Sequence, residues 1–227
     1  MAGMKVSKEE NNRSEVKEKI KAAALKLFLK NGIKEVKMDD IASLISVSKR
    51  TIYELFSDKE LLITETLTQH QKQMHDEAKL IIKDSTDTLD VILRLYGLFF
   101  SKLQKINRKF FADLARYPNL HNHNKEREKK NSKKFIAWME EGRKQGLFRE
   151  DADFKILLYI MKRELDHIVM LKAQNTQEEE LSRYTSEQLG QLLILFYLRG
   201  IATPKGQEKI EEFIQKHQTT KNNNYES

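Results

Sequence analysis

Apolar residues return every three or four positions along most of this 227-residue chain, and this spacing predicts helices rather than strands. In the first third, apolar faces, caps and stops predict helices over residues 14–30, 38–44, 49–56 and 58–83. Gly32 marks the end of the first helix, because glycine readily takes the left-handed conformation that closes one. The fourth helix has no breaker and is long enough to leave one domain and enter the next.

The strongest apolar stripe of the chain runs from Leu89 to Ile106 at helical spacing. A further short helical segment follows it, and we expect Pro118 to end that segment. A polar loop is expected over residues 119–124, and a charged helix should follow it as far as Gly146.

Two more apolar helices are predicted around residues 154–172 and 186–201, separated by a loop. The second of these is apolar nearly all round, so both of its faces should be covered. The polar ends of the chain, residues 1–13 and 218–227, are expected to be a disordered arm and a disordered tail.

Composition supports an all-α fold. Only two prolines and eight scattered glycines occur, whereas sheets need turn residues about every 8–12 positions. The absence of cysteine excludes disulfides, thiolate catalysis and cysteine-based zinc sites. No apolar run is long enough to span a membrane and no signal peptide is visible, so we expect a cytoplasmic protein without membrane contact. The net charge of +7 is compatible with a nucleic-acid partner but is weak evidence alone.

Residues 38–56 have the layout of a helix-turn-helix, with two short helices joined by about four residues. Ile52 and Phe56 lie one turn apart and give the second helix an inward face. Lys49 and Arg50 lie in its first turn, which is the end that such motifs insert into the major groove of DNA.

Residues 14–67 resemble the DNA-binding head of TetR-family transcriptional regulators. The resemblance is carried by Ala24, Phe28, Gly32, Asp40, Ile41, Ala42, Val47, Ser48, Lys49, Thr51, Ile52, Tyr53, Phe56, Lys59, Glu60, Leu61 and Leu62. Residues 68–217 resemble the family's ligand-binding and dimerisation domain more loosely, through Phe110–Leu114, Tyr117–Pro118 and Gly146–Arg149. The resemblance implies an N-terminal three-helix head, joined by a long helix to a C-terminal bundle.

Three positions depart from the family pattern. Lys37 stands where the family usually has a hydroxyl residue, and Ile45–Ser46 stand in the turn where it usually has Ala-Gly. Ser46 would then need a backbone conformation that is uncommon outside glycine. Arg50 stands where many relatives carry glycine, so a cation lies where the recognition helix begins and base preference should change.

The predicted DNA-binding residues are polar or basic positions around the two short helices: Lys37, Ser48, Lys49, Arg50, Thr51, Tyr53 and Lys59. Arginine can pair bidentately with guanine, and Thr51 can contact a phosphate or a thymine methyl. Thr51, Tyr53 and Lys59 match backbone-contacting positions by resemblance, and the start of the fourth helix is a natural anion site. The alternatives are an ordinary solvated face for Lys49, Arg50 and Lys59, and a core position for Tyr53.

The family resemblance also implies a pocket in the C-terminal bundle for a small-molecule effector. Its candidate lining residues are Tyr96, Phe99, Phe100, Phe111, Trp138, Met139, Tyr159, Met161, Arg163 and His167. An aromatic stripe at helical spacing is more often packed core, so that alternative stays open. The helices near 154–172 and 186–201 are expected to pair with a second copy in a four-helix homodimer interface. The alternative is that the second helix is the buried centre of one subunit.

These observations predict a dimeric repressor that binds a near-palindromic double-stranded operator and is released by an effector. A non-specific architectural DNA-binding protein is the alternative, and activation is not excluded. No phosphate-binding loop, dinucleotide loop or nucleophile elbow is present, so we expect neither an enzyme nor a cofactor. His121 and His123 suggest a metal ion at first, but no third ligand is placed beside them.

Overall fold

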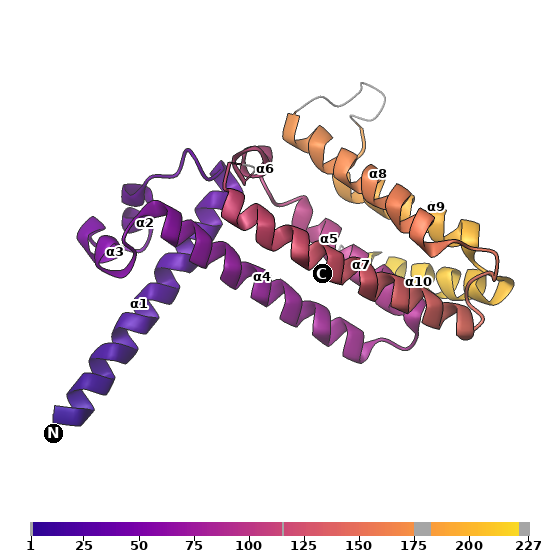
Figure 1. The fold of residues 1–227 in the computed structure, drawn as a ribbon, viewed down its shortest axis with the longest axis horizontal. Helices are drawn as coiled ribbons and strands as arrows, with labels where there is room; N and C mark the ends of the chain where they lie inside the picture. The colour runs from indigo at the N-terminus through magenta and orange to yellow at the C-terminus, as the bar shows by residue number, and fades with distance from the viewer. Residues whose placement is uncertain (1, 115, 175–182, 223–227) are drawn as a thin grey trace. The chain divides into compact units, whose positions relative to one another are not determined.

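The computed structural model describes residues 2–114, 116–174 and 183–222, and within them the chain forms ten helices and no strand (Figure 1). The all-α prediction is therefore confirmed. In chain order the helices are α1 (Ala2–Asn31), α2 (Met38–Leu44), α3 (Lys49–Leu55), α4 (Lys59–Asp84), α5 (Thr88–Leu103), α6 (Arg108–Leu114), α7 (Pro118–Lys144), α8 (Phe154–Gln174), α9 (Ser186–Ile201) and α10 (Pro204–Asn222).

The helices belong to two compact units. Unit 1 comprises Met1–Glu77 and Lys105–His121, and unit 2 comprises Ala78–Gln104 and Asn122–Ser227. Unit 1 thus contains the head predicted over residues 14–67, together with the first part of α4 and the short helix α6. A boundary between residues 67 and 68, as the sequence suggests, would place α6 with the C-terminal domain.

The structure corrects the predicted start of the first helix. Helix α1 begins at Ala2 instead of Ser14, so residues 2–13 continue the helix where a disordered arm was expected. This stretch holds no proline and is rich in residues that favour helices, so nothing in it interrupts the helix. At the other end, α10 reaches Asn222 and takes in the first part of the expected tail, while residues 223–227 lie outside the described residues.

The loop expected over residues 119–124 is also wrong, because α7 begins at Pro118 and runs through that stretch. Proline is well suited to the first position of a helix, where no backbone donor is needed and its fixed φ already fits. Pro118 therefore starts a helix, although its place after an apolar segment suggested a stop.

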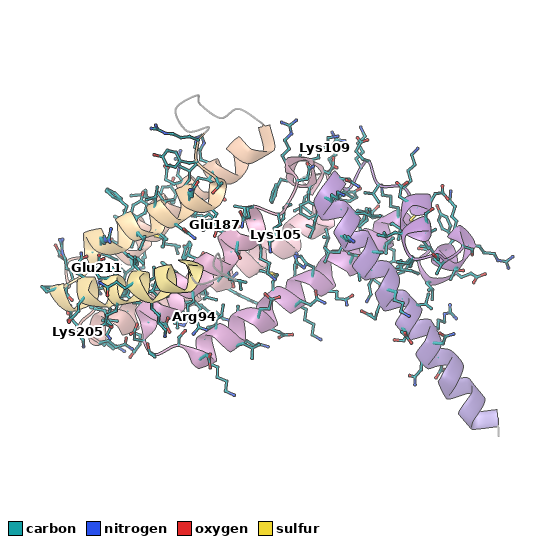
Figure 2. All side chains as sticks on the ribbon, turned by 180° about the vertical axis from the view of Figure 1, so that it is seen from behind. Arg94, Lys105, Lys109, Glu187, Lys205 and Glu211 are labelled. Atoms are coloured by element: carbon teal, nitrogen blue, oxygen red, sulfur yellow. The ribbon has the colours of Figure 1, made fainter. Side chains whose placement is uncertain are left out.

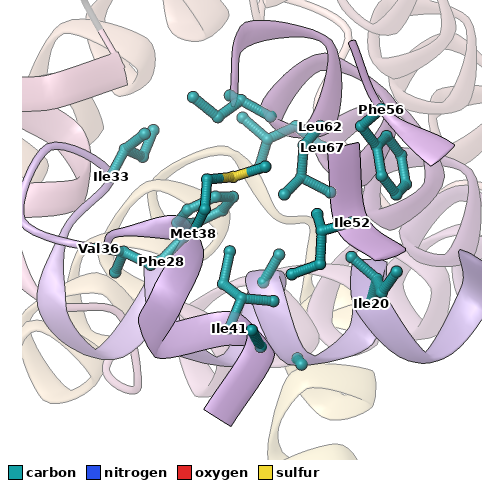
Figure 3. Packing of buried hydrophobic residues seen from close by; sticks show 14 of the residues in the cluster. Ile20, Phe28, Ile33, Val36, Met38, Ile41, Ile52, Phe56, Leu62 and Leu67 are labelled. Atoms are coloured by element: carbon teal, nitrogen blue, oxygen red, sulfur yellow. The ribbon is translucent and has the colours of Figure 1, made fainter. Parts of the chain in front are cut away.

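Unit 1 has one apolar core, which Figure 3 shows between the first part of α4 and helices α1 to α3. Its fully buried side chains include Ile20, Phe28, Ile41, Ile52, Phe56 and Leu62. Val36 of the loop after α1 and Met38 at the start of α2 also belong to this core (Figure 3). Each short helix is thus held by a few side chains that reach this shared core, since helices of two turns are not stable alone.

Helix α6 packs on the C-terminal end of α1. Asn107 donates from its backbone N–H to the Leu29 carbonyl at 2.7 Å and from its side-chain amide to the Lys30 carbonyl at 2.8 Å. The buried carboxylate of Asp113 accepts from the Lys34 N–H at 2.8 Å. The Leu29 and Lys30 carbonyls are among those that the end of α1 leaves without intrahelical partners, while the Lys34 N–H belongs to the loop that follows.

Gly32 closes α1 in the left-handed conformation with φ +88°, as its place after Asn31 predicted. A Cβ at this position would lie 2.7 Å from the Cβ of Lys109, which Figure 2 labels on α6, and 3.0 Å from Asp113 Oδ2. Glycine is therefore needed here twice, for its backbone conformation and for the close approach of α6.

Unit 2 has a separate apolar core built from α5, α7, α8, α9 and α10. Its most buried members include Ile92, Met139, Phe148, Phe154, Met161, Leu198 and Ile210. The turn after α7 and the turn after α9 meet through backbone bonds from Arg149 N–H to the Ile201 carbonyl and from Thr203 N–H to the Leu147 carbonyl. An ion pair of 2.6 Å between Arg199 and Glu211, the latter labelled on α10 in Figure 2, further ties α9 to α10.

Candidate nucleic-acid interface

Local hydrogen bonds define the start of α2 and the turn that follows it. The Asp40 carboxylate accepts from the Lys37 N–H at 2.7 Å, which satisfies a donor ahead of the helix. After α2 the chain reverses at Ser46, which takes the left-handed conformation with φ 55° as the departure from Ala-Gly required. The Val47 N–H then bonds the Ala42 carbonyl at 3.0 Å and directs the chain into α3.

Ser48 is the N-cap of α3, as predicted. Its hydroxyl accepts from the Thr51 N–H at 3.0 Å and lies 2.8 Å from the Thr51 hydroxyl. A cap of this kind fixes the first turn of a two-turn helix, which has few other bonds to hold it. Ser48 therefore has a structural role in α3, whatever it contacts on a ligand.

One side of α3 enters the core and the other lies in solvent. Ile52 is fully buried, as is Phe56 just after the helix, and Lys17 of α1 lies over the Phe56 ring at 5.1 Å. On the opposite side Tyr53 keeps 47% of its surface exposed, which sets aside the alternative that it is a core residue. This division leaves the outward side chains of α3 available to a partner.

The two cations at the start of α3 each pair with a carboxylate. Lys49 Nζ lies 2.8 Å from Asp39 Oδ2 of α2, and this pairing raises the pKa of Lys49. Arg50 Nε lies 2.9 Å from Glu54 Oε1, one turn along α3. The Arg50 side chain is 88% exposed, so its guanidinium stands in solvent while it is held from one side. The sequence pattern did not predict a part for Asp39 or Glu54 in this surface.

Lys59 is used differently from what its sequence position suggested. Its ammonium group donates to the Ile33 carbonyl at 2.8 Å and to the Lys34 carbonyl at 3.3 Å. Partial burial lowers the pKa of Lys59, and the nearby Asp113 carboxylate opposes that shift. Two of its three donors thus stabilise the loop after α1, and its contact with a DNA phosphate stays a prediction.

Helix α4 begins at Lys59, one residue later than predicted, and Asp58 caps it. Asp58 Oδ1 accepts from the Leu61 N–H at 2.8 Å, and Ser57 donates its hydroxyl to Asp58 Oδ2 at 2.9 Å. Both hydrogen bonds lower the pKa of Asp58, and the one from the Leu61 N–H contributes most. A carboxylate at this position also interacts favourably with the helix dipole.

The residues that join separate helices of the head were not predicted from the sequence. Arg13 of α1 donates to the backbone carbonyl of Glu54 at 3.0 Å, at the end of α3. Asn107 and Asp113 hold α6 against α1 through the bonds described above. No local pattern identifies these side chains, because their partners lie between 41 and 79 residues away in the chain.

The predicted pocket residues are divided between the two units, and within unit 2 between exposed and buried positions. Phe111 packs in unit 1 against the head, whereas the others belong to unit 2. Tyr159, Arg163 and His167 are exposed on α8, and Phe99 is 43% exposed on α5. Tyr96, Phe100, Trp138, Met139 and Met161 are buried or half-buried within unit 2.

Tyr96 lies beside two other aromatic rings of unit 2. Its ring centroid is 6.3 Å from that of Phe100 and 6.4 Å from that of Phe135, and burial raises the pKa of its hydroxyl. This neutral phenol among apolar rings is the part of the predicted set with the character of an apolar binding site. Whether these residues bind a ligand stays a prediction.

Large apolar side chains are exposed on α8 and α9, which pack against each other. The most exposed are Ile156, Tyr159, Ile160, Leu192 and Phe196, the last at 75%. A groove of about 620 Å³ lies beside them, lined by Leu157, Leu192, Leu195, Phe196, Tyr197, Arg199, Gly200 and Ile201. Within one chain, therefore, only one side of the apolar helix α9 is covered.

Among the residues that the structure describes, no group of three potential ligands is placed to hold a metal ion, and no helix could cross a membrane. The side chains of His121 and His123 lie outside the described residues.

Comparisons with known proteins support the interpretation of the head. Residues 20–66 match the family model for bacterial regulatory proteins of the tetR family. The chain is similar to the DNA-binding transcriptional repressor TetR of Mycobacteroides abscessus, with 30% identity over 42% of this chain and 48% of that protein. It thus spans about half the length of that relative. It is also 24% identical to the HTH-type transcriptional repressor KstR2 of Mycolicibacterium smegmatis, over 81% of this chain and 89% of the relative.

A similar solved structure comes from Saccharomonospora viridis. That protein is described as a transcriptional regulator and was crystallised in complex with choline. The TM-score is 0.71 with 20% identity, and the match covers 84% of this chain and 99% of the other. At this identity the likeness concerns the fold, which therefore extends over both units.

Proposed function

We propose that the chain is a transcriptional regulator of the TetR family and acts as a dimeric repressor, which binds a near-palindromic operator through α3 and releases it when a small molecule binds in unit 2. The observation that carries the proposal is the division of α3. Its buried side anchors it in the head, and its outward side presents Lys49, Arg50 and Tyr53. A short, capped helix with exposed cations in its first turn is suited to entering the major groove.

Several predicted residues support DNA binding by different chemistry. Arg50 carries the bidentate donors that guanine selects, while Tyr53 offers a hydroxyl to a phosphate. Thr51 is half-buried and shares its hydroxyl with Ser48, so its contact to DNA would compete with that bond. Lys37 is exposed just before α2 and offers a further phosphate contact.

The exposed apolar face of α8 and α9 supports a homodimer. Leu192 and Phe196 lie one turn apart on α9 with more than half of each side chain in solvent. Side chains of this size are normally covered, and a twofold axis would cover them with the same face of a second copy. Two helices from each subunit would then form a four-helix interface, which would set two recognition helices about 34–36 Å apart.

The effector is proposed as an apolar or amphipathic small molecule bound in unit 2, near Tyr96 and Phe100. Support comes from the aromatic rings that surround the Tyr96 hydroxyl, those of Phe100 and Phe135. Such a ligand would release DNA only if it bound one conformation of the dimer more tightly than the other.

Anisotropy titration of labelled duplexes tests the proposal. The duplexes would carry the promoter region beside the protein's own gene or a scrambled sequence of equal composition, and salt would be varied. A repressor prefers the promoter duplex at physiological salt, whereas an architectural protein binds both equally and loses affinity steeply with salt.

A further inference from the structure

The geometry points to Glu54 as a positioning residue that aims Arg50 at one guanine of the operator. Glu54 would act by holding Arg50 Nε, so that the two terminal nitrogens face the base edge. This inference rests on the proposed function, because it assigns a specificity role within the same interface.

The contact between the two side chains is well formed. Arg50 Nε donates to Glu54 Oε1 at 2.9 Å across one turn of α3. The Glu54 side chain is 57% exposed and that of Arg50 is 88% exposed, so both lie on the outward side of the helix. The backbone under Glu54 is held as well, because Arg13 donates to its carbonyl at 3.0 Å.

Because Glu54 accepts from Nε of Arg50, the donors on the two terminal nitrogens stay available for DNA. A guanidinium has five N–H donors in a planar fork, and the bond to Glu54 occupies the one at Nε. The edge formed by Nη1 and Nη2 then remains for a bidentate pair with guanine O6 and N7. Without Glu54 the side chain rotates freely and can also reach a phosphate, so the orientation that selects guanine becomes one of several.

Lys49 provides the contrast on the same helix. Its ammonium group pairs with Asp39 at 2.8 Å, but an ammonium is a point charge without a preferred edge. Holding it therefore selects no particular base. The specificity device is thus the Arg50–Glu54 pair, at a position where many TetR-family relatives carry glycine.

The carboxylate of Glu54 also repels DNA phosphates, which gives the inference a distinctive signature. Removing Glu54 should weaken discrimination at one base pair while leaving affinity for scrambled DNA unchanged or higher. If Glu54 only stabilised α3, its removal would lower the discrimination and the affinity for scrambled DNA together.

The test begins with selection of a preferred duplex from a randomised library by the full-length protein. Anisotropy is then measured on that duplex and on its single-base-pair variants. For Glu54→Ala we expect discrimination at one base pair to fall about five- to tenfold, at the lower end of the range that a bidentate contact supplies. Arg50→Lys should lose discrimination at the same base pair, and the double variant should lose no more than Arg50→Lys alone.

Two further variants separate geometry from charge. Glu54→Gln keeps an oxygen that can accept from Nε, so it should restore part of the discrimination, while its affinity for scrambled DNA should equal that of Glu54→Ala. Glu15→Ala removes a carboxylate from another exposed pair of the same spacing, Glu15–Lys19 on α1, and should leave base discrimination unchanged.

The inference is overturned if Glu54→Ala discriminates like the wild type. It is also overturned if Glu54→Ala and Arg50→Lys affect different base pairs, since Glu54 would then read a cytosine amino group itself. Failure of the wild type to select any duplex would overturn the proposed function as well, and would be seen before any variant is made.

Discussion

The contact between Gly190 of α9 and Phe100 of α5 offers a sharp test of how unit 2 is packed. A Cβ at residue 190 would bring three ring carbons of Phe100 within 3.0 Å, closer than side chains approach in folded proteins. The Phe100 ring is fully buried and lies against Phe99, with centroids 5.2 Å apart, so it has little room to turn away. Gly190→Ala should therefore strain the contact between α5 and α9.

The size of the effect follows from two opposing contributions. Overpacking a well-filled core costs about 1–3 kcal/mol, and a fully buried ring places this site near the upper end. Alanine in place of glycine within a helix returns up to about 1 kcal/mol. The net loss should be about 2 kcal/mol, which for a chain of this length lowers the melting temperature by roughly 4–8 °C.

Thermal unfolding followed by circular dichroism measures this shift, and Gly97→Ala is its matched control. Gly97 lies inside α5, and a Cβ there would meet no neighbouring atom within 4 Å, so alanine should raise the melting temperature by roughly 1–4 °C. Adding Phe100→Leu to Gly190→Ala should cost less than the sum of the two single changes. If Gly190→Ala is as stable as Gly97→Ala, Phe100 does not pack against α9 as described.

Four further changes test the head and the proposed interfaces. Phe196→Asp should convert the dimer to monomer in analytical ultracentrifugation, because it places a charge in the centre of the apolar face. Gly32→Ala should lower the free energy of unfolding by about 1–3 kcal/mol in denaturant titration, since φ is +88° and α6 is close. Lys37→Ala should weaken binding to all duplexes alike. It should also reduce the slope of log Kd against the logarithm of the salt concentration by about one, the contribution of one phosphate contact. Asp58→Ala should reduce stability at neutral pH, and its difference from the wild type should shrink as the pH falls below 3.8.

The pH dependence at Asp58 has a defined sign. The pKa of this carboxyl is lowered in the folded protein, so its contribution is present above the ordinary value of 3.8 and is lost as the pH falls through the folded pKa. A difference between Asp58→Ala and the wild type that grew on acidification would contradict the cap. If Phe196→Asp left a dimer intact, the proposed homodimer interface would be refuted. If Lys37→Ala left the salt dependence of binding unchanged, the proposed phosphate contact would be refuted.

The elements of the head that are set by local interactions could be predicted from the sequence. Helix α1 ends directly before Gly32, α2 has the predicted bounds and α3 differs by one residue, because glycine stops, caps such as Ser48 and the spacing of Ile52 and Phe56 act within a few positions. The left-handed turn at Ser46 followed in the same way from a departure in the family pattern.

Contacts between distant segments could not be predicted in this way. Lys59 has the sequence context of a phosphate-binding residue, yet two of its donors bond carbonyls of the loop after α1. The sequence pattern assigned Glu54 no part in this surface, because its distance to Arg50 depends on side-chain rotamers that no periodicity describes. The role of Pro118 could not be predicted for another reason. Proline is found both after the end of a helix and at the first position of one, and the residues that follow decide which role it has.

The apolar pattern of α9 predicted a helix with two covered sides, but it did not identify what covers the second side. Its nearly continuous apolar surface predicted cover on both sides, and within one chain only one side is covered. Exposed Leu192 and Phe196 favour a second copy over the alternative of a helix buried within one subunit.

The proposed function requires above all that the dimer reads a specific operator through α3. The decisive quantity is the affinity of the full-length protein for its best duplex relative to a scrambled duplex, at physiological salt and with known oligomeric state. We expect a preference of about a thousandfold or more, for a site with two half-sites about one helical turn apart. Equal affinity for the two duplexes would contradict the proposed function.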